Sequence, residues 1–263
     1  MNERQREDTA NMPEELHRYG WMLHKDDDTF DMKVFSQPVT SEMLREFEEL
    51  VAVICTLQPL ATAFAICDRE YAALASLAES QEARLNAIGT ARVPLKTVFD
   101  LIVETSASVT AFLGGASAFL GQMEYALATH WGKTSEKYAV WNRKRQQRHA
   151  ASLGYRVMYK LRNYSQHHAM PLSTLSVTGI RATSDAAMTF TCRPTLERDV
   201  LVASSFNWGP QRAELAAFPP AFDIVPLLTE YFECLQAIML DAVQVFDQEL
   251  RSCHDYLEVV RAS

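Results

Sequence analysis

The hydrophobic pattern changes at Pro171, and this change constrains the fold more than any other feature of the chain. Before Pro171, apolar residues recur every three or four positions, as on one face of an amphipathic helix. After it come short alternating or β-branched runs at 175–178, 188–192 and 200–203, which are typical of strands. Helical spacing returns at about 223–260. We therefore expect a mainly α protein, a bundle of four to five long helices with a small antiparallel β-sheet inserted before the last helix.

Four helical stretches are expected ahead of Pro171, each bounded by a capping residue, a proline or a glycine. They cover about residues 40–58, 60–87, 94–131 and 135–168. Pro59 is expected to interrupt or kink the first pair. Pro171 ends the fourth helix, because proline disfavours the helical conformation in the residue before it. The apolar stripe of the fourth helix consists of Ala150, Leu153, Val157, Leu161 and Tyr164.

The first 38 residues differ from the rest of the chain. They are polar, include the acidic run Asp26-Asp27-Asp28 and show no sustained period. We expect residues 1–38 to form a partly irregular arm. No internal repeat or low-complexity linker divides the remainder, so residues 39–263 are expected to form a single domain with its β insertion at about 172–206.

Residues 105–123 contain no charged side chain in nineteen positions. A membrane span needs about 20 predominantly apolar residues, but this stretch is rich in Ser, Thr, Ala and Gly. We expect a buried helix in which Gly114, Gly115 and Gly121 allow a neighbour to approach closely. The first twenty residues lack the apolar segment of a signal peptide, and five scattered cysteines form no metal or redox motif. These features predict a cytoplasmic protein with reduced cysteines, no membrane partner and no metal site.

The charge distribution is uneven. The net charge is −8, which argues against general affinity for nucleic acids, yet residues 133–168 hold nine basic side chains and one acidic one, so the remainder carries −16. Two interpretations stay open: the basic segment pairs with acidic neighbours or carries a solvated face, or it presents a phosphate-binding face. Cations interleaved with aromatic rings suit contact with RNA. The candidate RNA-binding residues are Arg148, Tyr155, Arg156, Tyr159 and Lys160.

The end of the fourth helix carries the sequence Arg162-Asn163-Tyr164-Ser165-Gln166-His167. It resembles the R-x4-6-H motif of the HEPN ribonuclease superfamily, with four residues between Arg162 and His167 and five between Arg162 and His168. A polar residue directly after the arginine is typical of active members, and the family fold is a four- to five-helix bundle with the motif in a late helix. The pairs Arg18/His24 and Arg143/His149 match the bare spacing but lack the following asparagine.

The chemistry of metal-free RNA cleavage fits these residue types. Such cleavage requires a base for the 2′-hydroxyl, an acid for the leaving 5′-oxygen and a cation for the charged phosphorane. Histidine has an unperturbed pKa of about 6.5 and serves as either base or acid, while the arginine fork matches phosphate oxygens. We take Arg162, His167 and Asn163 as the catalytic candidates, with Asn163 orienting the histidine or the phosphate. No cofactor is required.

Helix geometry separates the two main candidates. An ideal helix places Arg162 and His167 about 140° apart, so either the helix unwinds before Pro171 or two copies each contribute a residue. The resemblance implies the second arrangement, a composite site in a homodimer. His168 falls near the apolar stripe and is expected to be a packed core residue. The sequence leaves open which of the two histidines is functional.

Two function classes remain. The first is a metal-independent endoribonuclease acting on RNA; the resemblance alone implies a toxin, abortive-infection or stress role, with an antitoxin or regulatory protein as a further partner. The second is a non-catalytic helical module that binds a protein partner or RNA. The phosphate-loop, dinucleotide and zinc-protease motifs are all absent from the sequence.

Overall fold

The structure is a computed structural model that describes residues 20–24, 29–34, 41–88, 93–170, 172, 174–181 and 188–262. The helices are α2 (Ser41–Ile88), α3 (Leu95–Trp131), α4 (Glu136–Ala151), α5 (Leu153–His167), α6 (Arg198–Ala203), α7 (Gln211–Ala216), α8 (Val225–Val245) and α9 (Asp247–Ala262). The strands are β1 (Gly20–His24), β2 (Phe30–Val34), β3 (Thr174–Arg181), β4 (Met188–Glu197) and β5 (Ala221–Asp223). The prediction of a mainly helical protein with a small antiparallel sheet is confirmed.

The chain divides into two compact units. One comprises residues 1–55 and 249–263, the other residues 56–248. The boundary falls inside α2 rather than at residues 38–39, where the polar arm was expected to end. In the first unit β1 and β2 form an antiparallel hairpin, so the expectation that strands are confined to about 172–206 is wrong. The sequence signal that would have predicted β2 is the alternation of apolar and polar residues in Phe30-Asp31-Met32-Lys33-Val34.

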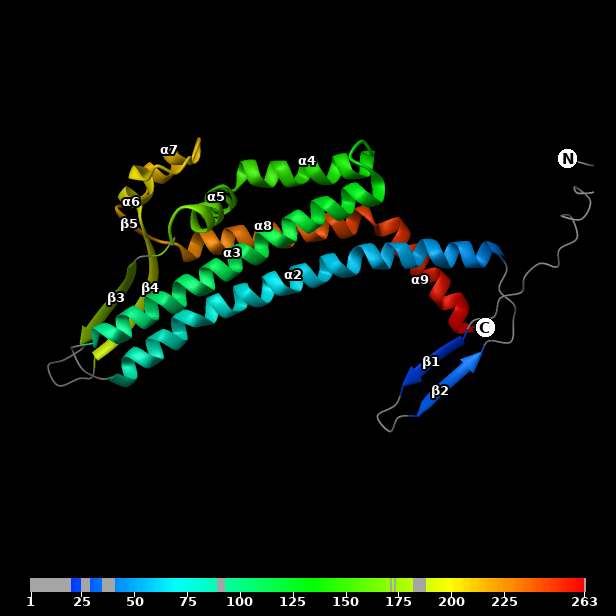
Figure 1. Cartoon of the computed structure of the whole chain (residues 1–263), viewed down its shortest axis with the longest axis horizontal. Helices are drawn as coiled ribbons and strands as arrows, with labels where there is room; N and C mark the ends of the chain where they lie inside the picture. Colours follow the sequence, from blue (N-terminus) through cyan, green and yellow to red (C-terminus); the bar gives the residue numbers. More distant parts are fainter. Residues whose placement is uncertain are drawn as a thin grey trace, which may run out of the picture. The chain divides into compact units, whose positions relative to one another are not determined.

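In the second unit, α3, α8 and the part of α2 after residue 55 run alongside one another (Figure 1), and aromatic side chains pack between them. Phe64 of α2 lies 5.3 Å from Phe119 of α3, measured between ring centroids. Tyr71 of α2 stacks on Phe232 of α8 at 4.1 Å, and Phe112 of α3 meets Phe232 edge-on at 6.3 Å. Because these rings come from three helices that lie far apart in the sequence, the core joins the early and late parts of the chain.

The structure corrects two expected helix boundaries, one at Pro59 and one at Ser152. Helix α2 runs through Pro59 without a break. A proline inside a helix costs about 3 kcal/mol, and the burial of Leu60 and Ala63 just after it provides packing that offsets this cost. The helix expected at 135–168 is two helices, because Ser152 ends α4 and its side chain caps α5 by accepting a hydrogen bond from the Tyr155 amide at 2.9 Å.

The break at Ser152 also changes which residues face the core. Val157, Leu161 and Tyr164 are buried as predicted, but Ala150 is exposed. A single helical wheel drawn through residues 135–168 therefore fails at Ser152. The last helix, expected at about 223–260, is likewise divided: α8 ends at Val245 and α9 begins at Asp247.

The sheet of the second unit has the order β3-β4-β5 and is antiparallel throughout. The first two predicted strands are confirmed as β3 and β4. The third, at 200–203, is wrong, because those residues form α6, and the third strand is β5, paired through Thr195 and Asp223. A short apolar run does not distinguish a strand from a buried helical turn by periodicity alone.

The uncharged stretch 105–123 lies within α3 and buries one side of that helix. A Cβ atom added to Gly115 would lie 3.6 Å from Cys67 Cα, so the close approach expected at the small residues occurs there. In the described part of the chain, Gly114 and Gly121 have no such neighbour within 4 Å. By length and composition alone, the α2 segment Leu44–Ile88 and α3 could cross a membrane. This is weak evidence, because core helices of soluble proteins pass the same test.

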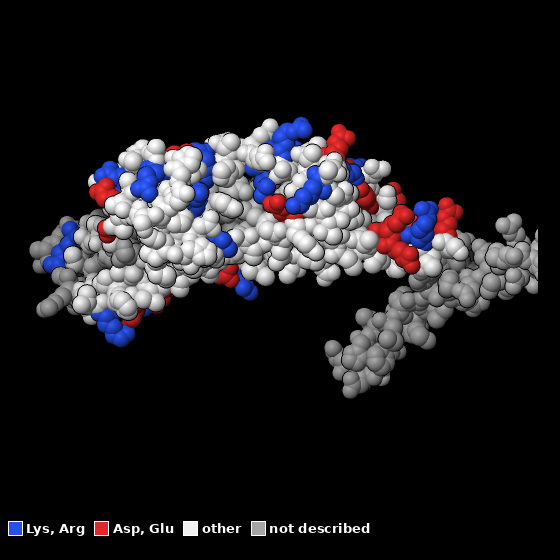
Figure 2. Space-filling model, turned by 45° about the horizontal axis from the view of Figure 1, so that its top comes forward, with Lys and Arg blue, Asp and Glu red and all other residues white. Residues whose placement is uncertain are grey.

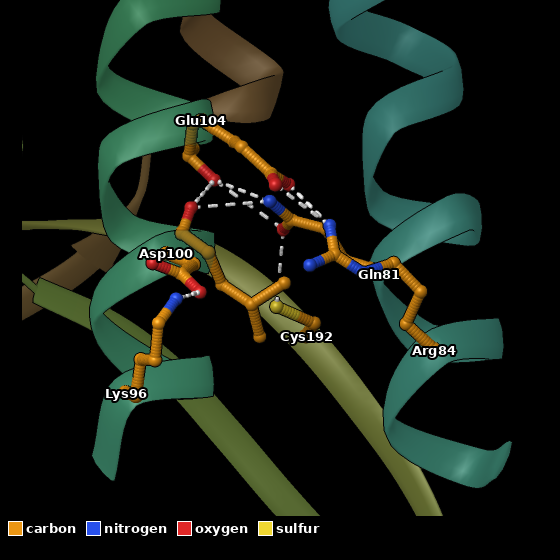
Figure 3. A network of polar contacts seen from close by, with 8 residues as sticks. Gln81, Arg84, Lys96, Asp100, Glu104 and Cys192 are labelled. Atoms are coloured by element: carbon orange, nitrogen blue, oxygen red, sulfur yellow. Dashed lines mark hydrogen bonds and ion pairs between the residues drawn. The ribbon is translucent and has the colours of Figure 1, made fainter. Parts of the chain in front are cut away.

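The sheet is fastened to α2 and α3 by polar side chains (Figure 3). The buried Gln81 amide donates to Leu101 O at 3.1 Å and to Thr105 Oγ1 at 2.9 Å, and its Oε1 accepts from Cys192 Sγ at 3.4 Å. Burial raises the pKa of the Cys192 thiol to about 11, so it remains a protonated packing group. Through Gln81, the buried core between α2 and α3 extends to Cys192 of strand β4.

Two more α2 side chains bind the backbone of β4. Glu82 Oε1 accepts from the Cys192 amide at 2.9 Å, and Asn86 Oδ1 accepts from the Phe190 amide at 2.7 Å. Since Glu82 and Asn86 are one helical turn apart, they match alternate residues of the strand. These bonds occupy backbone donors on the side of β4 that faces away from β3.

We expect Gln81→Met to destabilise the protein by about 1–3 kcal/mol, because it removes hydrogen-bond partners from groups buried between α2, α3 and β4. Thermal or urea unfolding would measure the change. The matched control is Arg84→Met, one turn further along α2, which removes the exposed ion pair with Glu104 (2.6 Å) and should change stability little. Equal effects of the two substitutions would contradict the importance of the buried network.

Candidate functional site at the end of helix α5

Helix α5 is held at its start by α8. The Gly154 amide donates to Glu230 Oε2 at 2.9 Å, which satisfies a backbone donor in the first turn of α5. A Cβ atom at position 154 would lie 2.6 Å from Leu227 O and 2.8 Å from Glu230 Cβ. The backbones of α5 and α8 therefore approach closely at Gly154. This contact determines the direction of α5 and hence the position of its last turn.

The last turns of α5 place Arg162 beside Asn163. Arg162 Nη1 donates to Asn163 Oδ1 at 2.9 Å, and both residues are half-buried. Arg162 Nε is buried and has no hydrogen-bond partner among the described residues. Burial raises the pKa of Tyr231 in α8, and the positive charge of Arg162 is a smaller, opposing cause. The guanidinium thus lies in the region between α5 and α8, and no ion pair joins it to a carboxylate in the described part of the chain.

His167 and His168 both reach the surface. His167 is the last residue of α5, and its side chain is exposed. His168 was expected to be a packed core residue, and this expectation is wrong: it is exposed, with its ring 5.1 Å from that of Tyr164. As the C-cap, with φ −133° and ψ −64°, His168 has left the helical spiral, so the apolar stripe does not extend to it. No contact joins either histidine to Arg162 among the described residues.

The candidate RNA-binding residues are largely occupied within the fold. Arg148 binds Asp241 through Nη2 at 2.8 Å, and Arg156 binds Glu214 through Nη2 at 2.7 Å. Tyr155 is 3% exposed, which contradicts its expected place on an open face. Tyr155 packs against Tyr231 of α8 with 5.2 Å between ring centroids, so the buried side of α5 is wider than the predicted apolar stripe.

Tyr159 and Lys160 remain closer to solvent. Tyr159 is 43% exposed, and its ring lies 6.2 Å from that of His149. Lys160 is half-buried. Burial, together with the nearby charges of Arg156 and Arg145, lowers the pKa of His149. The structure therefore leaves two of the five candidate RNA-binding side chains accessible without breaking an ion pair.

Acidic neighbours account for much of the basic segment. In addition to Arg148 and Arg156, Lys144 binds the buried Asp241 at 2.9 Å and Arg145 binds Glu124 at 3.2 Å. Figure 2 shows basic and acidic atoms interspersed on the visible face, rather than an unbroken basic patch. Of the two interpretations of the charge asymmetry, ion pairing within the fold holds for these four cations.

Two hollows of the described residues lie away from the motif. A cavity of about 80 Å³ is lined mostly by apolar residues of α2 and α8, with Gln81 and Thr105 as its polar members. An open groove of about 280 Å³ lies between α4 and α8. Neither is lined by the motif residues. Among the described residues, no group of three or more His, Cys, Asp or Glu side chains is placed to hold a metal ion.

Sequence reasoning missed an aromatic cluster at the end of α5. The Tyr164 ring stacks on Trp208 at 5.3 Å, and Phe206 packs edge-on against Trp208 at 4.9 Å. Phe206 also lies 6.1 Å from His168. The available signal was the run Phe206-Asn207-Trp208, two aromatic residues in a segment without regular period.

No known protein family, curated protein or solved structure matches the chain. The site is therefore described by its own residues: a half-buried Arg162 hydrogen-bonded to Asn163, followed one turn later by an exposed histidine.

Proposed function

We propose that the protein is a cytoplasmic, metal-independent endoribonuclease of the HEPN type, with Arg162, Asn163 and His167 as its catalytic residues. The observation that carries the proposal is the hydrogen bond of 2.9 Å from Arg162 to the neutral amide of Asn163, one turn before the exposed His167. A toxin, abortive-infection or stress role, with an antitoxin or regulatory partner, accompanies the family resemblance.

The partner of Arg162 distinguishes it from three other arginines of the basic segment. Arg145, Arg148 and Arg156 each bind a carboxylate, which offsets their charge. Asn163 holds the Arg162 guanidinium in place without neutralising it. A fixed cation of this kind can stabilise a phosphorane, because little reorganisation is needed when the negative charge develops.

The proposed reaction divides the work among three side chains. Neutral His167 removes the proton of the 2′-hydroxyl, or protonated His167 gives one to the leaving 5′-oxygen. Arg162 stabilises the pentacoordinate phosphorane through its planar fork. Asn163 keeps the guanidinium oriented. Arg162 and His167 of one site come from different copies of the chain, since the two residues of one copy do not contact each other, and water serves as the remaining acid or base.

A homodimer is the expected assembly. Light scattering at micromolar concentration should give twice the chain mass, and the interface should bury more than about 1,000 Å² in total. A monomer that cleaves RNA at full rate would contradict the composite site. Mixing inactive Arg162→Ala chains with inactive His167→Ala chains offers a further check, because mixed dimers should regain one intact site if the two residues act from different copies.

RNA cleavage in the presence of EDTA tests the proposal most directly. Purified protein should cleave RNA with EDTA present and leave 2′,3′-cyclic phosphate ends, because the 2′-oxygen is the nucleophile. Absence of cleavage, or cleavage that stops on chelation, would reject the metal-independent nuclease.

A non-catalytic helical module is the second candidate. The ion pairs of Arg148 and Arg156 and the burial of Tyr155 favour it, because they remove three of the five residues proposed to bind RNA. In that case Arg162 and His167 would be binding or structural residues. RNA or protein binding without any strand cleavage would support the module.

A further inference from the structure

We propose that Phe206 and His168 form a stacking site for an unpaired nucleobase beside His167. The site lies at the junction of α5 with the 204–209 segment, a part of the β-containing insertion, which in the structure extends from β3 to β5 (174–223), rather than of the helical bundle. It rests on the proposed ribonuclease function for its role in cleavage, and it would make the enzyme select single-stranded RNA.

The aromatic cluster has an inner and an outer layer. Trp208 is fully buried and Tyr164 is 3% exposed, and their rings stack at 5.3 Å. Phe206 is half-buried and His168 is exposed, with 6.1 Å between their ring centroids. The inner pair supports the fold, while the outer pair presents ring surface to solvent. His168 follows His167 directly in the chain, with consecutive Cα atoms about 3.8 Å apart, so the backbone of the outer pair begins one residue from His167.

The segment that carries Phe206 is firmly held. Trp208 Nε1 donates to Leu201 O at 2.8 Å. The Arg212 guanidinium donates to the carbonyls of Val202, Ser204 and Phe206, with 2.8 Å to Phe206 O. A ring that is already fixed loses little conformational entropy when a base stacks on it.

The charge around the cluster fits a nucleotide. Arg212 is exposed and places a positive charge at the backbone of Phe206, and His167 adds a group that is cationic when protonated. Aromatic rings combined with cations bind single strands, because every base has a π face and every nucleotide a phosphate. A paired base inside a helix cannot offer that face, so the site discriminates by strand state rather than by sequence.

The test measures binding separately from cleavage. A short fluorescein-labelled RNA of mixed sequence, single-stranded or annealed to its complement, is titrated with full-length chain in the non-cleaving His167→Ala background. Phe206→Leu should weaken single-strand binding about 5- to 150-fold, the range for losing one base–aromatic stack, and should change duplex binding little. Phe206→Tyr should restore it, because it retains the ring.

The matched control is Phe218→Leu. Phe218 is another half-buried phenylalanine of the same insertion, and it stacks on Phe222 at 4.3 Å rather than on the α5 cluster. Circular dichroism and thermal melting would verify that each variant is folded. Unchanged single-strand affinity in folded Phe206→Leu, or an equal loss in Phe218→Leu, would overturn the stacking site.

The outcomes separate the two proposals. If the single strand binds through Phe206 but otherwise unmodified protein cleaves no RNA, the ribonuclease proposal fails and the stacking site stands. If unmodified protein cleaves RNA in a manner that requires Arg162 and His167 while Phe206→Leu binds and cleaves normally, the ribonuclease proposal stands and the stacking site fails. Absence of all RNA binding would reject both.

Discussion

Replacing His167 by alanine is expected to lower the rate of RNA cleavage by about 10²–10⁴-fold, the usual contribution of a positioned acid or base. The same substitution should change stability by less than about 1 kcal/mol, because an exposed helix-end histidine contributes mainly through the helix dipole. Arg162→Ala should abolish cleavage in the same way. Single-turnover cleavage rates and urea unfolding curves of the same preparations would separate activity from stability.

His149→Ala is the matched control. Arg143 and His149, with five residues between them, match the bare R-x4-6-H pattern by chance, and His149 packs against Tyr155 with 5.0 Å between ring centroids. This substitution should leave cleavage nearly unchanged and cost some stability. Folded His167→Ala protein that still cleaves at the original rate would show that the motif is not catalytic, and unfolding of both His167→Ala and Arg162→Ala would reassign the motif to structure.

Gly154→Ala is expected to destabilise the protein by about 1–3 kcal/mol, the cost of overpacking a close contact. Alanine is ordinarily favoured over glycine inside a helix by about 1 kcal/mol, but here the added methyl group would meet Leu227 O at 2.6 Å. Because that oxygen belongs to the backbone of α8, relief requires α5 and α8 to separate. Thermal unfolding would measure the loss.

Gly121→Ala provides the opposite case. Gly121 also lies inside a helix, but among the described residues no atom beyond its own stretch of the helix lies within 4 Å of its added Cβ. This substitution should stabilise the protein by about 0.4–1 kcal/mol, since it restricts the unfolded chain at no steric cost. A stability gain in both glycine variants would show that the α5–α8 contact is looser than the structure indicates.

The period of the hydrophobic residues predicted the helices and strands whose pattern repeats over many residues. Helix α3 (Leu95–Trp131) closely matches its predicted range of 94–131 because its many turns repeat one pattern. Strands β3 (Thr174–Arg181) and β4 (Met188–Glu197) contain the predicted runs at 175–178 and 188–192 but extend beyond them. The break at Ser152 depends instead on one side-chain hydrogen bond to the Tyr155 amide. A polar residue within a strong helical pattern gives no sign of whether it caps or simply faces solvent.

For the candidate site, too, local sequence signals were predictive and contacts between distant residues were not. Arg162, Asn163 and His167 could be selected by residue type and spacing, and their helix could be predicted. The ion pairs of Arg148 and Arg156 could not, because Asp241 and Glu214 lie 93 and 58 positions further along the chain. Phe206 was missed for a related reason: its relation to His168 arises only when the insertion folds back onto α5.

The stack of Tyr71 on Phe232 has a consequence for the protein during its synthesis. A ribosome adds roughly 5–20 residues each second, so on the order of 10–30 s separate the appearance of Tyr71 from that of its aromatic partner. Until α8 emerges, the nascent chain displays the aromatic side of α2 and α3 without its cover. Exposed apolar surface of this kind promotes aggregation. We therefore expect a chaperone to bind the incomplete nascent chain more readily than the folded protein.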